Sequence, residues 1–481
     1  VRDLGGHDLA GLADTFRGAD PQRPSVVFAY TIKGYRLPTE GHPANHSALL
    51  SQAQFETLAS SLGTDASDPW RAFPPQSPEG RLCASVARRL RREPVASPAA
   101  VDVPASVSPG HRGTVSTQAT LGRLLLDLLR TAPDVAARVV TVSPDVASST
   151  NLAGWLNKVG VFGAVAGQPR RDWFADDGET LLRWAEKADG QHIQLGIAEG
   201  NLVGLLGELG STWNRWGEPI IPIGTLYDPF VNRALEPWTF GVYAGGQSIL
   251  VGTPSGVSLA PEGGAHQSII SPSVGLEHPG VVAYEPAFAQ DLEWTLLHAM
   301  RFVGRPGGCS AYFRLTTRPV DQALADGDDP ERRLDCVRGG YLLRSPSKVD
   351  CRIAVVGALV PEGLRACDLL TGHGITAALV VVTSADLLFR ATRLRAGLAV
   401  DGPPELVDES ILDRLFPDSV PMVTVLDGHP HTLAFLGTIR NAPTACLGVS
   451  SFGQSSTLAE AYRLHGIDAD SICATALDLV D

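Results

Sequence analysis

Short runs of apolar and β-branched residues recur along the 481 residues of this chain, and stretches with helical spacing separate several of them. The runs in the middle of the chain are RVVTVS, PIIPIGT, QSILVGT, GVVAYEP and CSAYFRL. Helical segments at 201–209 and 291–303 fall between some of these runs. Because strand and helix alternate, the sequence predicts an α/β fold in which helices cover both faces of a parallel sheet.

The alternation resumes beyond a polar stretch, PVDQALADGDDPERRLD, which predicts a domain boundary near residue 330. The strand candidates beyond it are RIAVVGA, ITAALVVVT, PMVTVLDG and TACLGVS. A helix is expected after each of them, beginning at Pro361, Ser384, His431 and Thr457. Residues 336–481 are therefore expected to form a second, smaller α/β domain.

The first part of the chain predicts an incomplete domain. Residues 1–92 contain an expected helix, one strand at 25–31 (SVVFAYT), a polar loop and a further helix. A parallel strand needs neighbouring strands and covering helices, and none precedes this one. We therefore expect that a substantial N-terminal portion is missing or is carried on another chain. Residues 93–115 are rich in Pro, Ala, Ser and Val, which predicts a linker or a wrapping segment.

Charge and cysteine usage narrow the range of partners. The formal net charge of −13 argues against nucleic acid and against an anionic membrane as partners, because both require basic patches. No run of 18 apolar residues occurs, so no membrane-spanning helix is expected. The seven cysteines show neither CxxC nor zinc spacing, which is typical of free thiols in a reducing compartment such as the cytoplasm.

The segment QHIQLGIAEGN contains one carboxylate, Glu199, close to Leu195, Ile197 and Leu202 and just before an expected helix. A carboxylate in an apolar setting holds its proton more readily than one in water, which suits it to general acid–base chemistry. The alternative is a solvated glutamate in the first turn of a helix, where the macrodipole favours it.

Other candidate residues follow the expected strands, where the ligands of open α/β sheets collect. They are Asp145 after RVVTVS, Tyr227 and Phe230 after PIIPIGT, and Glu262 and His266 after QSILVGT. Asp145 could instead cap a turn, and the two aromatic residues could belong to the core. Glu262 and His266 lie four residues apart around two glycines, a pattern that favours function. The sequence shows no third potential ligand beside this pair, so the pair does not indicate a metal site.

The loop IKGYRLPTEGHPANH follows the first expected strand and carries Glu40 and His46. One interpretation is a mobile lid that brings an imidazole to the site, since histidine exchanges its proton near neutral pH. The other interpretation is an exposed loop with incidental histidines.

Five segments, in this order, resemble the thiamine-diphosphate enzymes of the transketolase superfamily, most closely the homodimeric first component of the pyruvate dehydrogenase complex. They are FAYTIKGYRLPTEGHPANH, TVSPDVASSTNL, QLGIAEGN, PIIPIG with YDPF, and GTPSGVSLAPEGGAHQS. The resemblance implies three domains in that family's arrangement. Residues 1–92 would be the tail of a diphosphate-binding domain, 116–325 a pyrimidine-binding domain and 336–481 a transketolase-like C-terminal domain.

The resemblance also implies roles around the cofactor. Glu199 corresponds to the glutamate that bonds a pyrimidine ring nitrogen, and this bond promotes loss of the thiazolium proton. Tyr227, Phe230 and Ile197 correspond to residues that contact the pyrimidine.

Substrate-side roles follow from the same resemblance. Glu40 and His46 correspond to a loop that orders over the substrate adduct, with His46 used in acetyl transfer to a lipoyl group. Glu262 and His266 correspond to an acid–histidine pair near the substrate carboxylate. Asp145 corresponds to an active-site aspartate.

The chain departs from the family pattern in two places. The family motif that binds magnesium and diphosphate begins GDG, and this chain has none, so the Mg²⁺ ligands are expected in the portion before residue 1. Arg36 stands where related loops have glycine, which reaches positive φ more freely than arginine does.

The implied function is oxidative decarboxylation of a 2-oxoacid, above all pyruvate, on thiamine diphosphate. The acetyl group would pass to the lipoyl domain of an acyltransferase component, and the enzyme would be a homodimer. The alternatives are a transketolase, which moves a ketol unit between sugar phosphates, and a partial or non-catalytic subunit of a split enzyme.

Overall fold

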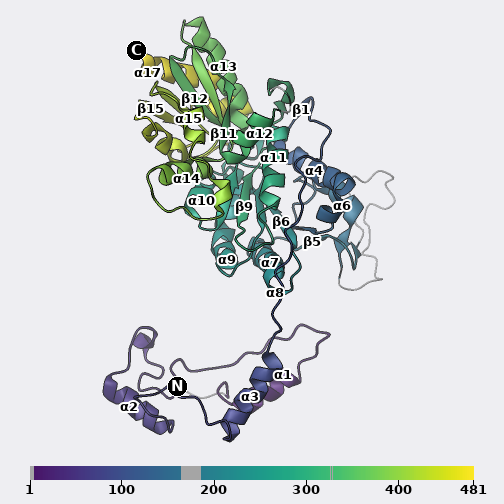
Figure 1. Ribbon diagram of the computed structural model, residues 1–481, viewed down its shortest axis with the longest axis vertical. Coiled ribbons are helices and arrows are strands. Elements are labelled where there is room, and N and C mark those ends of the chain that lie inside the picture. The colour runs from purple at the N-terminus through teal and green to yellow at the C-terminus, as the bar shows by residue number, and fades with distance from the viewer. Residues whose placement is uncertain (1–4, 164–185, 326, 328) are drawn as a thin grey trace. The chain divides into compact units, whose positions relative to one another are not determined.

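The computed structural model describes residues 5–163, 186–325, 327 and 329–481 (Figure 1). The chain divides into two compact units, Val1–Pro94 and Val95–Asp481. All seven cysteines are free thiols. In the part of the chain that the structure describes, no helix combines the length and the apolar character needed to cross a bilayer.

The first unit is a set of short helices joined by long loops. Its helices are α1 (Leu9–Arg17), η1 (Pro43–His46), α2 (Gln52–Ser61) and α3 (Pro78–Leu90). Among its described residues, Gly6, Ala59 and Gly80 are the ones that are buried. Local polar and ring contacts therefore order much of it, such as the stacking of His7 on Tyr35 with ring centroids 3.7 Å apart.

The strand predicted at 25–31 is wrong. The segment is not part of any sheet, and its alternate side chains Val26, Phe28 and Tyr30 are exposed. An isolated extended segment cannot form a ladder, because each strand needs hydrogen bonds from a neighbour, and no described residue of this unit provides one.

The larger unit contains an eight-stranded sheet in which every neighbouring pair is parallel. Its strands, in chain order, are β2 (Val139–Ser143), β3 (Val161–Phe162), β4 (Glu186–Lys187), β5 (His192–Gln194), β6 (Ile221–Leu226), β7 (Ile249–Gly252), β8 (Val281–Tyr284) and β9 (Ser310–Arg314). Their order across the sheet is β4-β3-β5-β2-β6-β7-β9-β8. The predicted parallel sheet is confirmed.

Helices cover both faces of this sheet. Along the chain they are α4 (Thr117–Thr131), α5 (Pro133–Ala136), α6 (Ala153–Val159), α7 (Glu199–Gly210), α8 (Thr212–Arg215), α9 (Val231–Tyr243), α10 (Val274–Glu277) and α11 (Ala289–Met300). Short 3-10 turns are η2 (Asp228–Phe230), η3 (Ala260–Glu262), η4 (Gly264–His266) and η5 (Ser271–Ser273).

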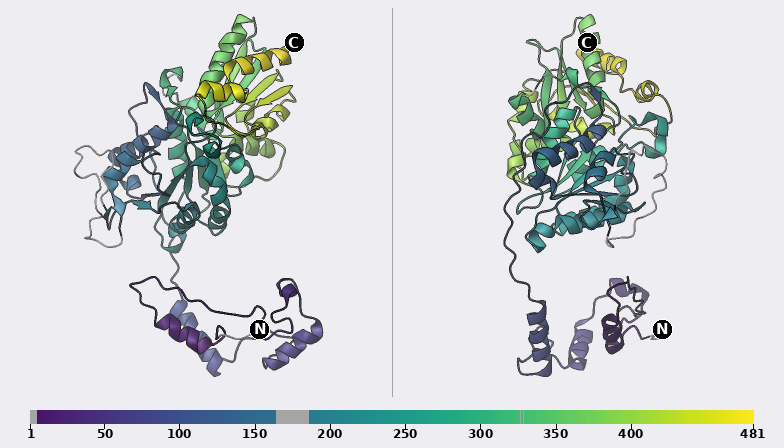
Figure 2. Two further views of the ribbon diagram at one scale, coloured as in Figure 1. Left: turned by 180° about the vertical axis from the view of Figure 1, so that it is seen from behind. Right: turned by 90° about the vertical axis from the view of Figure 1, so that its right-hand side faces the viewer.

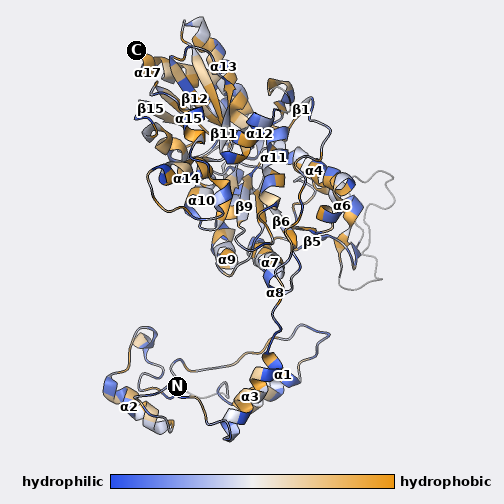
Figure 3. Ribbon diagram, in the orientation of Figure 1, coloured by the Kyte–Doolittle hydropathy of each residue, from blue (hydrophilic) through white to orange (hydrophobic). Residues whose placement is uncertain are grey.

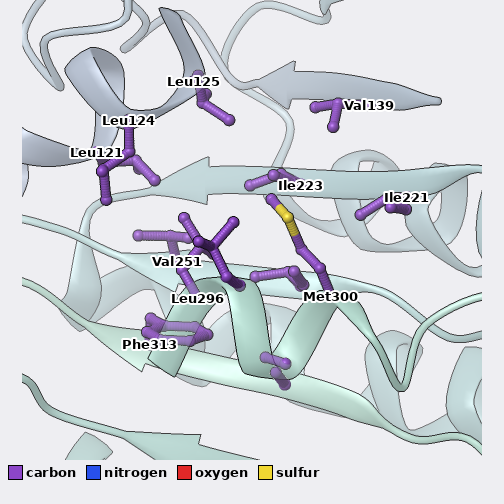
Figure 4. Packing of buried hydrophobic residues seen from close by; sticks show 14 of the residues in the cluster. Leu121, Leu124, Leu125, Val139, Ile221, Ile223, Val251, Leu296, Met300 and Phe313 are labelled. Carbon is purple, nitrogen blue, oxygen red and sulfur yellow. The ribbon is translucent and has the colours of Figure 1, made fainter. Parts of the chain in front are cut away.

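Alternate strand residues face opposite layers, as a two-sided sheet requires. On one face, side chains of α4 and α11 such as Leu124 and Met300 meet Ile223 and Val251 (Figure 4). On the other face, Leu226 and its neighbours pack against α7 and α9. Hydrophobic colour accordingly concentrates along the central strands, while the covering helices are mixed (Figure 3).

The C-terminal part of this unit forms a five-stranded sheet of order β11-β13-β12-β14-β15, with β11 antiparallel and the others parallel. Its strands are β11 (Gly340–Arg344), β12 (Cys351–Val356), β13 (Ala377–Val382), β14 (Met422–Val425) and β15 (Thr444–Leu447). Its helices are α12 (Pro330–Arg338), α13 (Val360–Gly372), α14 (Ala385–Arg395), α15 (Ile411–Leu415), α16 (Leu458–Leu464) and α17 (Ala469–Val480). The 3-10 turns from here on are η7 (Gly357–Leu359), η8 (Pro404–Leu406) and η9 (Pro430–Thr438).

The predicted second α/β domain is confirmed in its alternation, with differences in detail. Helices α13 and α17 pack on one face of its sheet (Figure 2). The helix expected from His431 is the 3-10 segment η9. The polar stretch near residue 330 is not purely a boundary, because Asp329 caps α12 there.

Residues 95–113 lie along the eight-stranded domain as a strap, ahead of the small ladder of β1 (Thr114–Val115) with β10 (Val320–Asp321), which η6 (Gln322–Leu324) follows. Val103 and Val107 of the strap are buried. Glu293 of α11 fastens the strap by accepting hydrogen bonds from the Val107 and Ser108 N–H groups, at 2.7 and 2.9 Å. The strap is therefore held to the domain by buried side chains and by hydrogen bonds to α11.

Candidate functional site

The carboxyl ends of four neighbouring parallel strands, β5, β2, β6 and β7, lie along one edge of the large sheet. Each of these ends leads into a loop that carries a predicted site residue. Parallel strands direct their following loops to one side, which is where open α/β sheets bind ligands. Four of the predicted residues come together there in a single cluster.

Glu199 is the first residue of α7, and only 6% of its surface is exposed. Its position at the positive end of the helix dipole stabilises a negative charge. The nearest cation is Arg233 of α9, whose Nη1 lies 3.8 Å from Glu199 Oε2. The Arg233 side chain is 58% exposed, so the ion pair joins a buried carboxylate to a cation at the surface.

Two aromatic rings lie next to Arg233 in the site. The Arg233 guanidinium lies over the Phe230 ring, 4.4 Å from its centroid. Phe230 and Tyr227 are nearly parallel, with an interplanar angle of 9° and centroids 6.2 Å apart. His266 meets both rings edge-on, at 5.7 Å from Phe230 and 6.1 Å from Tyr227. We call Glu199, Arg233, Phe230, Tyr227 and His266 the ring cluster.

Glu262 extends the ring cluster on the far side of His266. Its Oε2 lies 4.0 Å from His266 Nδ1, and both side chains are partly exposed. Between them Gly263 has φ +82, a left-handed conformation that favours glycine. A Cβ on Gly264 would lie 2.4 Å from the Gly453 carbonyl oxygen, so the C-terminal domain holds this loop closely.

Two predicted residues lie apart from the ring cluster. Asp145 is exposed with φ +68, and its Oδ1 accepts a hydrogen bond from Gln194 Nε2 at 3.2 Å. Ile197, predicted to contact the pyrimidine, is 82% exposed, and that role stays a prediction. Gly196, with φ +71, turns the segment just ahead of Ile197.

Glu40 and His46 belong to the first unit, in a loop that bonds to itself. Glu40 Oε2 accepts a hydrogen bond from the Arg36 N–H at 2.7 Å, and His46 Nδ1 lies 2.9 Å from Lys33 Nζ. Arg36 has φ +64, the left-handed region that the glycine of related loops would enter more easily. Asn45 Nδ2 closes the loop by donating to the Lys33 carbonyl oxygen at 2.7 Å.

A buried charge network surrounds Asp228, and no pattern in the sequence predicted it. Asp228 sits between Tyr227 and Phe230 and is fully buried. It accepts hydrogen bonds from Arg314, Tyr312, Ser268 and Ser271. These partners lie 40 or more residues away along the chain, so sequence spacing gave no signal of the pairing.

Arg314 joins this network to the C-terminal domain. Its Nη1 lies 2.6 Å from Glu285 Oε2, and its Nη2 donates to the Asp427 carbonyl oxygen at 3.0 Å. Burial raises the pKa of Glu285 from 4.5 to about 7, although Arg314 acts to lower it. Asp427 in turn accepts hydrogen bonds from the Val257 and Ser258 N–H groups, which start the loop to Glu262.

No group of three or more histidine, cysteine, aspartate or glutamate side chains in the described part of the chain is arranged to hold a metal ion. The ring cluster offers one buried carboxylate, flat aromatic surfaces and one imidazole. This set suits a planar heterocycle with a ring nitrogen that can share a proton, better than it suits a cation.

Comparison with known proteins shows what the chain as a whole resembles. Residues 339–468 match the family described as the transketolase-like TK C-terminal domain. The pyruvate dehydrogenase E1 component of Mycolicibacterium smegmatis (strain ATCC 700084 / mc(2)155) is 27% identical over 516 residues, which span 98% of this chain and 54% of that protein. This chain thus spans about half the length of the curated relatives it matches.

Solved structures share the fold. Transketolase from Campylobacter jejuni subsp. jejuni NCTC 11168 superposes with a TM-score of 0.67 at 15% identity, covering 98% of this chain and 65% of that one. A structure titled as a split gene transketolase, an inactive β4 tetramer, gives a TM-score of 0.51 at 18% identity and covers 76% of this chain and 98% of that one. The resemblance seen in the sequence is confirmed, and the fold is transketolase-like.

Proposed function

We propose that this transketolase-like chain forms the pyrimidine-binding side of a thiamine-diphosphate site, and that the enzyme it belongs to decarboxylates a 2-oxoacid. The observation that carries the proposal is the burial of Glu199 at the start of α7, connected through Arg233 to two nearly parallel aromatic rings. A buried carboxylate beside flat apolar surface fits an aminopyrimidine, which offers both a planar face and a basic ring nitrogen.

The residues of the ring cluster would have different roles in binding and catalysis. Glu199 would hold a proton at a carboxylate oxygen and share it with the ring nitrogen, and its burial keeps water from competing. Tyr227 and Phe230 would contact the ring and fix its plane. When bound, thiamine diphosphate supplies a nucleophilic carbon and an electron sink for decarboxylation.

Substrate contacts are proposed on the side of Glu262 and His266. His266 lies against both rings, and its ring nitrogens can donate or accept hydrogen bonds to a substrate. Pyruvate is the proposed 2-oxoacid, because the five ordered motifs and the pyruvate dehydrogenase relatives agree. Transfer of the acetyl group to a lipoyl domain, with help from His46 and Glu40, is part of the same proposal.

The diphosphate and its Mg²⁺ need ligands that the described residues do not group together. We therefore propose that these ligands come from outside the ring cluster.

The test compares Glu199→Gln with Glu208→Gln, a substitution of the exposed glutamate near the other end of α7. The protein, as the cell makes it, is assayed with pyruvate, thiamine diphosphate, Mg²⁺ and an artificial electron acceptor. We expect Glu199→Gln to lose at least about a hundredfold in turnover, the scale of acid–base catalysis, and Glu208→Gln to keep wild-type turnover. Equal turnover in both variants would refute the role of Glu199.

Transketolase chemistry is the second candidate, and Arg233 is the observation that favours it. A guanidinium that is 58% exposed at the mouth of the ring cluster could bind the phosphate of a sugar. Turnover of a ketose phosphate, with no turnover of pyruvate, would establish this alternative. An inactive chain that gains activity only with a separate diphosphate-binding polypeptide would indicate a subunit of a split enzyme.

A further inference from the structure

We propose that a hollow between α11 and α12, away from the ring cluster, binds a small organic anion that carries an apolar or aromatic body. The hollow measures about 340 Å³ and is lined by the two helices and by residues 104 and 105 of the strap. Pockets of about this size accept metabolite-sized ligands. None of its lining residues takes part in the proposed decarboxylation.

One wall of the hollow is apolar. Trp294 and Leu297 of α11 and Val337 of α12 are buried side chains that line it. Leu334 of α12 stands at the rim, 48% exposed. An indole and three aliphatic side chains offer the kind of surface on which a ring or a short apolar body packs.

The rest of the lining is basic. Arg301, Arg333 and His298 line the hollow, and no aspartate or glutamate does. Arg301 Nη2 donates to the Val103 carbonyl oxygen at 3.0 Å. Within the described part of the chain, neither Arg301 nor Arg333 has a carboxylate within ion-pair distance. The lining of the hollow is therefore basic, although the net charge of the chain is −13.

Two other arginines of α12, in contrast, form ion pairs with carboxylates. Arg332 Nη2 lies 3.0 Å from Asp291 Oδ1, and Arg338 Nη1 lies 2.6 Å from Asp408 Oδ2. Arg332 and Arg338 thus pair with carboxylates, whereas Arg301 and Arg333 form no ion pair with any described residue. Burial, together with the positive charges of Arg301, Arg338 and Arg333, lowers the pKa of His298 to about 4. His298 is therefore neutral at pH 7 and can donate one hydrogen bond and accept another.

The chemistry of the lining defines the ligand. Two guanidinium groups match a phosphate or a carboxylate, because each can donate a pair of parallel hydrogen bonds to its oxygens. The indole wall adds affinity for a ring or an alkyl body. A ligand with both parts should bind more tightly than either part alone, and inorganic anions alone should bind weakly.

The test is calorimetric titration of the full chain with 1-naphthyl phosphate, 1-naphthol and inorganic phosphate. We expect 1-naphthyl phosphate to bind at least tenfold more tightly than the other two compounds. Arg333→Gln removes one guanidinium and should weaken binding of 1-naphthyl phosphate about tenfold or more, the scale of one charge-assisted hydrogen bond. Leu334→Glu, which places an acid at the rim, should weaken it as well.

The matched control is Arg123→Gln, which alters an exposed arginine of α4 and changes the net charge equally. Its affinity should equal that of the wild type, and circular dichroism checks that each variant is folded. Equal affinity in Arg333→Gln and wild type would overturn the proposal, as would equal affinity for 1-naphthol and 1-naphthyl phosphate. Binding lost in Glu199→Gln but kept in Arg333→Gln would assign the anion to the ring cluster and would equally overturn it.

Discussion

Arg314 and Asp228 form a buried ion pair in which Arg314 Nε lies 3.1 Å from Asp228 Oδ2 and neither side chain is more than 2% exposed. Asp228 stands between Tyr227 and Phe230, whereas Arg314 also bonds to the Asp427 carbonyl oxygen of the C-terminal domain. The pair therefore connects the stacked rings of the site to the neighbouring domain. Positioning of the ring cluster and packing of the two domains depend on the same contact.

Arg314→Met should destabilise the protein strongly. The substitution leaves the Asp228 carboxylate buried without its cation, and breaking one side of a buried ion pair costs about 3 to 5 kcal/mol. Urea unfolding followed by circular dichroism measures this loss. Arg123→Gln, at an exposed site, should change the stability by less than about 0.5 kcal/mol. Similar midpoints for the two variants would show that the pair contributes little.

The raised pKa of Glu285 makes stability depend on pH. Glu285 ionises near 4.5 in the unfolded chain and near 7 in the folded protein, because burial disfavours its charge. Between these values the folded state binds more protons, so the free energy of unfolding falls as pH rises. Glu285→Gln cannot ionise and should gain about 1 to 3 kcal/mol over wild type between pH 4.5 and 7. A gain that is the same at pH 5 and pH 8 would contradict this.

Glu293 affects the pH dependence of stability in the opposite direction, because its pKa is lowered instead of raised. Burial would raise the pKa of Glu293, but hydrogen bonds from His111, Ser106 and the N–H groups of Val107 and Ser108 bring it down to about 2. The carboxylate therefore stabilises the fold fully above pH 4.5, and this stabilisation is lost as the pH falls from 4.5 toward 2.

Glu293→Gln should release the strap at residues 95–113. The neutral amide accepts these hydrogen bonds more weakly, at an expected cost of about 2 kcal/mol. Trypsin should then cleave after Arg112, which is exposed, faster than in wild type. Glu236→Gln, on the exposed side of α9, serves as the control and should leave the cleavage rate unchanged.

Sequence reasoning worked where local pattern decides structure. The apolar runs that became β6, β12 and β13 form buried strands, because continuous Val and Ile fit a sheet covered on both faces. The same reasoning failed for residues 25–31, since a strand exists only with a partner. The sequence patterns also did not predict α17. Its N-cap is Asp468, whose side chain accepts a hydrogen bond from the Ser471 N–H.

In the candidate site, too, some residues could be predicted from the sequence and others could not. Glu199, Tyr227 and His266 could be grouped beforehand, because they follow strands that are parallel and close in the sheet order. Arg233 and Arg314 could not, since their partners depend on how helices and domains pack. When a side chain acts through a contact with a segment far away in the chain, the spacing of residues in the sequence does not reveal that contact.

Two glycines of α7 should respond oppositely to the same substitution. Gly204 is exposed with no atom within 4 Å of an added Cβ, whereas a Cβ on Gly210 would lie 2.4 Å from the Gln247 carbonyl oxygen. Gly204→Ala should therefore stabilise the protein by about 0.5 to 1 kcal/mol through helix propensity. Gly210→Ala should destabilise it by about 1 to 3 kcal/mol through overpacking. Thermal unfolding of both variants decides the matter, and a shift of the same sign in both would contradict the packing of α7 described above.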